Sequence, residues 1–250
     1  MSVRLSPRDM VALTILAEMY GAPLDVVAAM LGVSINRAYR ITAKWEQARM
    51  LSARRVRPVP GPSWVVPTRS AAESLLGKPT RFWVPSPKMA AHTKAVLELR
   101  LALVGLDLER WVSERQLRAE VTPSGAGQIR THIHDGRYYT EAGALVAVEV
   151  EVTAKNAAQA KTSVWQALRA ANAAGCTAVH YYARKPEIKA LLRRTASELD
   201  LSTGPRLMLF DLDKALGLVQ ADTDSDTAAG ERAGLRVITG GISTPSGKAV

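Results

Sequence analysis

Residues able to support metal-dependent chemistry gather in one part of the sequence. Residues 145–153 alternate strictly between apolar and mixed positions, so Glu149 and Glu151 would share one face of a β-strand. Asp135 ends an earlier strand-like run. Carboxylates grouped in this way bind hard cations such as Mg²⁺ or Mn²⁺, and a nearby lysine, Lys155, could orient or deprotonate an attacking water. We therefore predict a candidate catalytic centre of Asp135, Glu149, Glu151 and Lys155, with the three acids as its metal ligands.

Histidines in the same region leave other interpretations open. His132 and His134 lie two residues apart beside Asp135, and together with Glu149 they could hold a transition-metal ion. Strand histidines that are merely hydrogen-bonded or exposed are more common. His92 falls at the start of an expected helix and is interpreted as structural.

The elements expected to position these residues form an α/β pattern. The pattern predicts a helix over 88–106, a strand or helix start at 111–115, and a strand over 129–133 that a turn at Asp135-Gly136 joins to a strand restarting at Arg137. Further on it predicts a helix over 157–174, a strand over 178–182, a helix over 186–199 and a strand over 206–210. We assign residues 88–219 to one α/β domain.

Positive charge is concentrated at the other end of the chain. The 250 residues carry a net charge of +10. Residues 1–88 hold 13 Lys and Arg against 5 Asp and Glu, a net charge of +8, and residues 89–250 hold the remaining +2. A localised basic module is the footprint expected of nucleic-acid binding. A basic face that meets an acidic protein partner is the alternative.

The basic module has the spacing of a helix-turn-helix. Ser6-Pro7 begins a first helix, residues 24–31 form a short second helix, and a turn at Gly32 leads to a third helix that Ser34 caps and that runs to about Met50. An ordinary three-helix bundle with a solvated basic face has the same spacing.

On the third helix, the exposed N-terminal part would carry the residues that read DNA. Asn36, Arg37 and Arg40 suit base edges, and Lys44 suits phosphates. Two short strand-like runs, 54–58 and 64–68, then flank a proline-rich turn and predict a basic hairpin. The predicted DNA-binding residues are Ser34, Asn36, Arg37, Arg40, Lys44, Arg54, Arg55 and Arg57, the three hairpin arginines lying on phosphates.

In this organisation residues 6–77 resemble the winged helix-turn-helix family. The α/β part is similar to the PD-(D/E)XK restriction-endonuclease-like superfamily, whose order is a helix, a three-stranded meander bearing the acids, a helix and a strand. This resemblance implies Asp135 as the first acid, with His134 in place of the usual proline, and Glu149 as the second. Glu151 stands where the superfamily has lysine, so Lys155 would replace that lysine, or Glu151 and Lys155 would form the motif instead.

Taken together, residues 6–213 resemble the replication-relaxation family of mobile-element proteins, on the stretches 92–103, 111–115 and 148–155. The resemblance implies a sequence-specific double-stranded DNA-binding protein that regulates transcription, replication or transfer. Its nuclease-like domain would be a non-catalytic platform for DNA contact or homodimer formation, and DNA binding itself would need no cofactor. A Mg²⁺-dependent DNA endonuclease targeted by the winged helix is the alternative.

The expected fold class is therefore a two-domain α+β or α/β chain, with a winged helix-turn-helix followed by a restriction-endonuclease-like mixed sheet flanked by helices. We expect domain 1–78, a proline-rich linker 79–87, domain 88–219 and a flexible acidic and polar tail 220–250. There is no apolar run of membrane-spanning length and no signal peptide pattern, and the single cysteine, Cys176, excludes a disulfide framework within the chain. These features predict a cytoplasmic, nucleoid-associated protein without a membrane partner.

Overall fold

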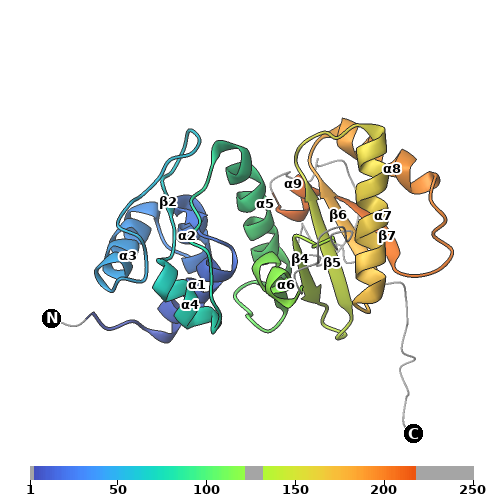
Figure 1. Cartoon of the computed structure of the whole chain (residues 1–250). Coiled ribbons are helices and arrows are strands. Elements are labelled where there is room, and N and C mark those ends of the chain that lie inside the picture. Colours follow the sequence, from blue (N-terminus) through green and yellow to red (C-terminus); the bar gives the residue numbers. More distant parts are fainter. Residues whose placement is uncertain (1–2, 122–131, 218–250) are drawn as a thin grey trace, which may run out of the picture.

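The computed structural model of the chain describes residues 3–121 and 132–217. It is a mixed α/β structure in which helices accompany a five-stranded mixed sheet (Figure 1). The predicted tail, 220–250, and most of the strand predicted over 129–133 lie outside the described residues. Among the described helices, none is long and apolar enough to cross a membrane.

Four helices make up the N-terminal part, and local capping signals define their ends. They are α1 (Pro7–Glu18), α2 (Leu24–Leu31), α3 (Ile35–Gln47) and α4 (Arg69–Leu76). Ser6 and Asp9 form a reciprocal capping box at the start of α1. Gly32 ends α2 at φ 59°, a left-handed conformation that favours glycine, and Ser34 then caps α3. The predicted succession of helices is confirmed, although α3 ends at Gln47 rather than near Met50.

The predicted basic hairpin is only partly present. Its second run contributes β2 (Trp64–Val65), which pairs with β1 (Ala22–Pro23) ahead of α2. The first run, 54–58, reaches β2 through one isolated bridge, between Val56 and Trp64. Prolines at 58, 60 and 62 remove the backbone N–H groups that a longer ladder would need, so a regular hairpin cannot form there.

The C-terminal part is built on one mixed sheet with the strands in sequence order. These are β3 (Trp111–Ser113), β4 (Gly136–Tyr139), β5 (Leu145–Glu151), β6 (Ala178–Ala183) and β7 (Arg206–Asp211). The pairs β3–β4 and β4–β5 are antiparallel, whereas β5–β6 and β6–β7 are parallel. Ser113 ends β3 and caps α6 (Glu114–Glu120), so residues 111–115 are both a strand and a helix start.

The prediction of a turn at Asp135-Gly136 is wrong. Residues 132–134 are not in a strand, β4 begins at Gly136, and the chain reverses instead at Thr140–Ala144 before entering β5. Gly136 is needed for packing, because a Cβ at this position would lie 2.2 Å from Cζ2 of Trp111 on the neighbouring strand. A glycine that permits close approach and a glycine that permits a turn look alike in sequence.

Helices cover both faces of the sheet. One face meets α5 (Pro87–Val104) and α9 (Leu212–Ala215), and the other meets α7 (Ala157–Ala173) and α8 (Pro186–Ser197) (Figure 1). Val146, Val148 and Val150 of β5 point into the α5 side, in one hydrophobic core that continues into α1 and α2. Ala147 lies in the second core, beneath α7 and α8. The glutamates of β5 therefore occupy a covered face.

A buried ion pair joins α1 to α5. The Arg100 side chain is fully buried, and its Nη2 lies 3.4 Å from Oε2 of Glu18. The same guanidinium donates hydrogen bonds to the carbonyls of Gly105 and Asp107, at 3.1 and 3.3 Å. Burial raises the pKa of Glu18 to about 7, against the opposing attraction of Arg100. Glu18 therefore gains or loses its proton near neutral pH.

This raised pKa predicts a pH-dependent effect of Glu18→Gln. Because the folded-state pKa exceeds the ordinary value of 4.5, the contribution of Glu18 to stability is fully present below about pH 4.5 and is lost as the pH rises through 7. We expect the free energy of unfolding of Glu18→Gln, relative to the unmodified chain, to increase by about 2 kcal/mol between pH 5 and pH 8. Urea titrations at both pH values measure this difference.

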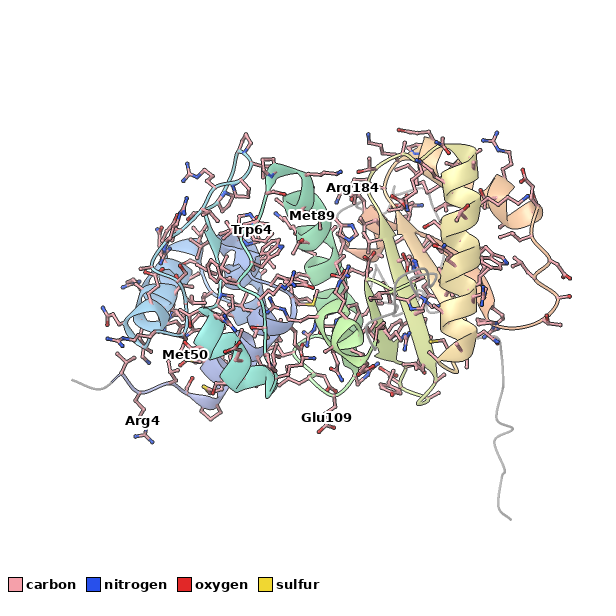
Figure 2. All side chains as sticks on the ribbon, in the orientation of Figure 1. Arg4, Met50, Trp64, Met89, Glu109 and Arg184 are labelled. Carbon is pink, nitrogen blue, oxygen red and sulfur yellow. The ribbon has the colours of Figure 1, made fainter. Side chains whose placement is uncertain are left out.

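Glu109→Gln is the matched control, since Glu109 is exposed on the loop between α5 and β3 (Figure 2). Its unfolding free energy should follow that of the unmodified chain at both pH values. Parallel pH profiles of the unfolding free energy for Glu18→Gln and the unmodified chain would contradict the raised pKa of Glu18.

Candidate functional site

Helix α3 presents one face to the core and the opposite face to solvent. Ala38, Thr42 and Trp45 are buried, and Trp45 Nε1 donates a hydrogen bond to Oδ1 of Asp9 at 2.9 Å. The predicted base-reading residues all fall on the solvent side, where Asn36, Arg37 and Arg40 are exposed. The packing of α3 therefore fixes a helix whose N-terminal half displays one amide and two guanidinium groups.

The other two residues predicted on α3 have local partners. Ser34 acts as the N-cap, with its Oγ accepting a hydrogen bond from the Arg37 N–H. Lys44 is exposed, and its ammonium lies 3.9 Å from Oδ2 of Asp9, a distance at which a surface ion pair contributes little to stability. Lys44 thus remains accessible to a phosphate.

The structure separates the three hairpin arginines. Arg54 and Arg57 are exposed, as a phosphate contact requires. Arg55 is instead folded onto α3, where Nε donates to Oε1 of Glu46 at 2.8 Å and Nη2 donates to Oγ1 of Thr42 at 3.0 Å. Its guanidinium also lies over the ring of Tyr39, 5.0 Å from the ring centre. Arg55 therefore braces α3 against the loop that follows it.

The structure brings Asp135 and Glu149 together from neighbouring segments. Asp135 directly precedes β4, and its Oδ2 accepts a hydrogen bond of 2.8 Å from the backbone N–H of Val150 on β5. Glu149, the preceding residue on β5, is 9% exposed. This hydrogen bond holds the Asp135 carboxylate alongside β5, as the sequence predicted.

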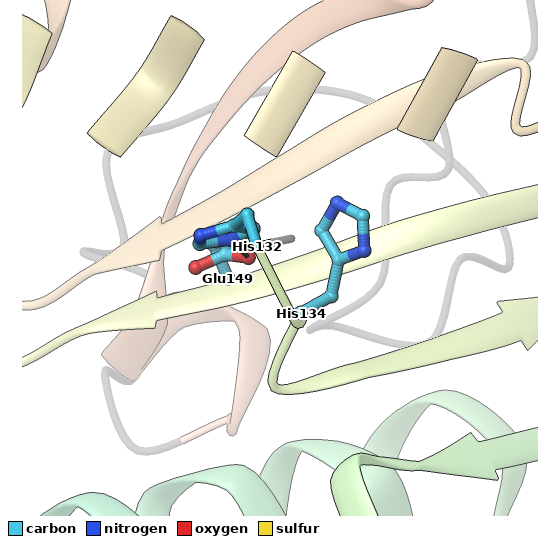
Figure 3. Close-up of side chains that lie close together, drawn as sticks. All are labelled: His132, His134 and Glu149. Atoms are coloured by element: carbon cyan, nitrogen blue, oxygen red, sulfur yellow. Dashed lines mark hydrogen bonds and ion pairs between the residues drawn. The ribbon is translucent and has the colours of Figure 1, made fainter. Parts of the chain in front are cut away.

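Each of these two carboxylates has a histidine partner. His92 Nε2 on α5 lies 3.0 Å from Oδ1 of Asp135. His132 Nε2 lies 2.7 Å from Oε1 of Glu149, and Figure 3 shows these two side chains together. Sequence reasoning missed His92, because its pairing with Asp135 spans 43 positions and is created by the packing of α5 on the sheet. No local pattern in the sequence signals such a contact.

Burial governs the ionisation of Glu149 and His132. Burial is the main reason that the pKa of Glu149 is raised to about 7; the hydrogen bond from His132 opposes the shift, and the charge on Asp135 adds to it. Burial alone would lower the pKa of His132, but the hydrogen bond to Glu149 and the charges of Glu149 and Asp135 together outweigh burial and leave the pKa raised. The contact therefore favours the protonated form of His132 beside Glu149.

His134 completes a group of three possible metal ligands, but it is committed elsewhere. One ligand atom from each of His132, His134 and Glu149 lies within 4.8 Å of the others. His134 is fully buried, with Nε2 bonded to the carbonyl of Ala167 at 3.0 Å and Nδ1 accepting from Arg137 Nε at 3.4 Å. Burial lowers its pKa to about 4, so it is neutral, with the proton on Nε2. Both nitrogens are occupied, and His134 acts as a structural residue.

Glu151 and Lys155 form a separate pair at the end of β5. The Lys155 ammonium contacts the Glu151 carboxylate and donates to Oγ of Ser163 at 3.3 Å. Lys155 is thus held by Glu151 instead of pointing between Asp135 and Glu149. Next to them, the buried hydroxyl of Tyr181, which is opposite Glu149 in the register of β5 and β6, has no hydrogen-bond partner among the described residues.

The donor set determines which cation the site would suit. Of the four carboxylate oxygens of Asp135 and Glu149, three are hydrogen-bonded, to His92, His132 and the Val150 N–H. Two of these three partners are imidazoles, so a cation held by the two carboxylates would lie beside ring nitrogens that could join it as ligands. Mixed imidazole and carboxylate donors suit Mn²⁺ and other first-row metals, whereas Mg²⁺ prefers oxygen alone. The arrangement therefore fits Mn²⁺ better than Mg²⁺.

Comparison of the chain with protein-family models, with curated proteins and with solved structures found no match.

The packing of Arg55 predicts a difference between neighbouring arginines. We expect Arg55→Gln to lower the free energy of unfolding by about 1–2 kcal/mol, because it removes two charge-assisted hydrogen bonds and leaves Glu46 half-buried without its partner. Arg54→Gln, the matched control at an exposed position, should change it by less than about 0.5 kcal/mol. Chemical denaturation of the three proteins checks this expectation, and equal stabilities would show that Arg55 does not brace α3.

Proposed function

We propose that the chain is a sequence-specific double-stranded DNA-binding protein that reads its site with α3. This helix would be the third helix of a winged helix-turn-helix domain and the second of its helix-turn-helix motif. The observation that carries the proposal is the solvent face of α3, where Asn36, Arg37 and Arg40 project from a helix anchored by a fully buried Trp45. A helix displayed in this way can enter a major groove without rearrangement of the core.

The chemistry of these side chains suits base reading. Arginine can donate two hydrogen bonds to O6 and N7 of guanine, and asparagine can pair with N6 and N7 of adenine. The three side chains lie one turn apart or less on the same helix, so together they would cover a few adjacent base pairs. Lys44, Arg54 and Arg57 are exposed around this face and would contact phosphates.

The remaining chain would serve as a platform for this reader. The order α5, β3, α6, β4, β5, α7, β6 supports a restriction-endonuclease-like unit in which α6 is inserted between the first two strands, and this unit would offer a second surface for DNA or for a homodimer partner. The pairing of Lys155 with Glu151 favours a non-catalytic unit, since the Lys155 ammonium is then bonded to Glu151 and not to Asp135 or Glu149. The biological role would be regulation of transcription, replication or transfer, in a mobile element or its bacterial host.

Replacing the two α3 arginines tests the DNA-reading assignment. A binding site is first selected from random duplexes with the unmodified chain, and affinity is then measured by fluorescence anisotropy on that site and on scrambled DNA. We expect Arg37→Ala with Arg40→Ala to remove about 1–3 kcal/mol of discrimination for each base that the missing guanidinium groups would read. Affinity for scrambled DNA should fall much less, because phosphate contacts remain.

The double variant Arg193→Ala with Arg194→Ala is the matched control. Both arginines are exposed on α8, so the change removes the same charge from the opposite end of the molecule (Figure 1). It should leave the selected sequence and the discrimination intact. Retention of full discrimination by the α3 variant would overturn the assignment of α3.

A metal-dependent DNA endonuclease is the second candidate function. It is favoured by one observation, the hydrogen bond from the Val150 N–H that places Asp135 next to Glu149. These two carboxylates would hold the cation, which when bound supplies activation of a water and stabilisation of phosphate charge. His92 and His132 would position the carboxylates or join them as ligands, and Lys155 would have to leave Glu151 to take part.

Incubation with supercoiled plasmid tests this candidate. If the endonuclease exists, Mn²⁺ should support nicking better than Mg²⁺, and Asp135→Asn should abolish it because the cation would have one carboxylate ligand fewer. Asp200→Asn, at an exposed position beyond α8, should nick like the unmodified chain. Absence of nicking with either cation at protein excess would eliminate the endonuclease and leave the DNA-reading proposal unaffected.

A further inference from the structure

A cavity of about 220 Å³ lies where the N-terminal helices meet the sheet-bearing part of the chain. Its walls come from the end of α1, the segment between α4 and α5, and helices α5 and α6. Six of the lining residues carry the argument: Glu18, Tyr20, Trp83, His92, Glu114 and Asp135.

Three carboxylates line the cavity, and each of them is paired with a basic side chain. Its three carboxylates reach it from separate parts of the chain, and its arginine, Arg118, is paired with one of them through a 2.9 Å bond from Nε to Oε1 of Glu114. Oε2 of Glu114 and Oε1 of Glu18 make no hydrogen bond to any described residue. Two acceptor oxygens therefore remain available, one of them on a glutamate that is only 9% exposed.

Aromatic rings form another wall. The rings of Tyr20 and Trp83 lie 5.5 Å apart at an interplanar angle of 42°. Tyr20 has φ 70°, a left-handed conformation that costs energy for a bulky residue, and the Arg115 guanidinium lies over its ring at 4.3 Å. The fold thus holds Tyr20 in a strained position at this cavity.

We propose that the cavity binds a small organic cation with a flat apolar body, such as an aryl amidine or an aryl amine. The cationic group would donate to the open oxygens of Glu18 and Glu114, and the apolar body would lie against Trp83 and Tyr20. The volume is below the roughly 300–1,000 Å³ usual for drug-sized ligands, so the ligand is small. This site is independent of DNA binding by α3.

Two other kinds of ligand fit the cavity less well. A neutral aromatic molecule of the same size would cover the carboxylates without replacing the water bonded to them, which costs free energy. An anion would find no unpaired cationic group among the described lining residues, since Arg118 is bonded to Glu114 and His92 to Asp135. Charge selectivity is therefore the property that distinguishes the proposed site from a nonspecific apolar crevice.

Three isosteric probes test the charge selectivity: benzamidine, benzamide and benzoate. Their affinities for the full chain, without DNA, are measured by ligand-observed NMR and by calorimetry. We expect benzamidine to bind at least about tenfold more tightly than benzamide, the factor for one charge-assisted hydrogen bond, and benzoate not to bind. No DNA is present, so the result is separate from that of the α3 experiment.

Two pairs of variants locate the site. Glu114→Gln should weaken benzamidine binding about tenfold, while Glu109→Gln, an exposed control, should not change it. Met89 lines the cavity and is 44% exposed, so Met89→Trp should fill the cavity and abolish binding without unfolding the chain. Met10→Trp makes the same change on α1, at a residue 38% exposed and outside the cavity, and should bind normally.

Thermal unfolding of all four variants verifies that each is folded. Binding of benzamidine that survives both Glu114→Gln and Met89→Trp would overturn the proposal. Equal binding of benzamidine and benzamide, or no binding of benzamidine by the unmodified chain, would overturn it as well.

Discussion

Packing of α5 on two sides at once is the constraint on which the arrangement of the molecule depends. Ala95, Val96 and Leu97 are consecutive and all buried, so this helix has apolar contacts around much of its circumference. It shares one hydrophobic core with α1 and α2 on one side and with β5 on the other. The position of α3 relative to the sheet is consequently determined by a packed core, and not only by the connecting segment 79–86.

The same packing determines which polar groups are buried together. A helix enclosed on two sides can bury polar residues only if they meet partners on the neighbouring elements. Arg100 meets Glu18 of α1, and His92 meets Asp135 beside β4. Both contacts lie along α5, and Glu18 and Asp135 line the same cavity beside this helix.

Local signals in the sequence predicted the helices and strands. The features that the sequence could not predict depend on contacts between residues far apart in the chain. Ser6, Ser34 and the alternation of residues 145–151 act within a few positions, and the helices and the strand follow them. The grouping of Asp135 with Glu149 was predicted, and His132 was considered beside them as a possible metal ligand, but the pairing of His92 with Asp135 was not predicted. Gly136 was predicted to form a turn. The position needs a glycine because Trp111 leaves no room for a Cβ, and Trp111 lies 25 positions away in sequence. Arg55 was predicted to contact phosphate. Its hydrogen bond to Glu46 depends on how the loop after α3 folds back, and the sequence around Arg55 does not reveal this.

Pairing of the acidic residues would let an acid cluster coexist with the proposed partner, DNA. The residues after 88 carry a net charge of only +2, so exposed, unpaired carboxylates there would repel DNA. Asp135 is paired with His92, Glu151 with Lys155, and Glu149 with His132. The field of these acids is therefore largely cancelled within the protein. If the chain binds DNA as proposed, the exposed arginines of α3 would meet little opposition from the sheet, and this favours the proposed reading of DNA over the proposed hydrolysis.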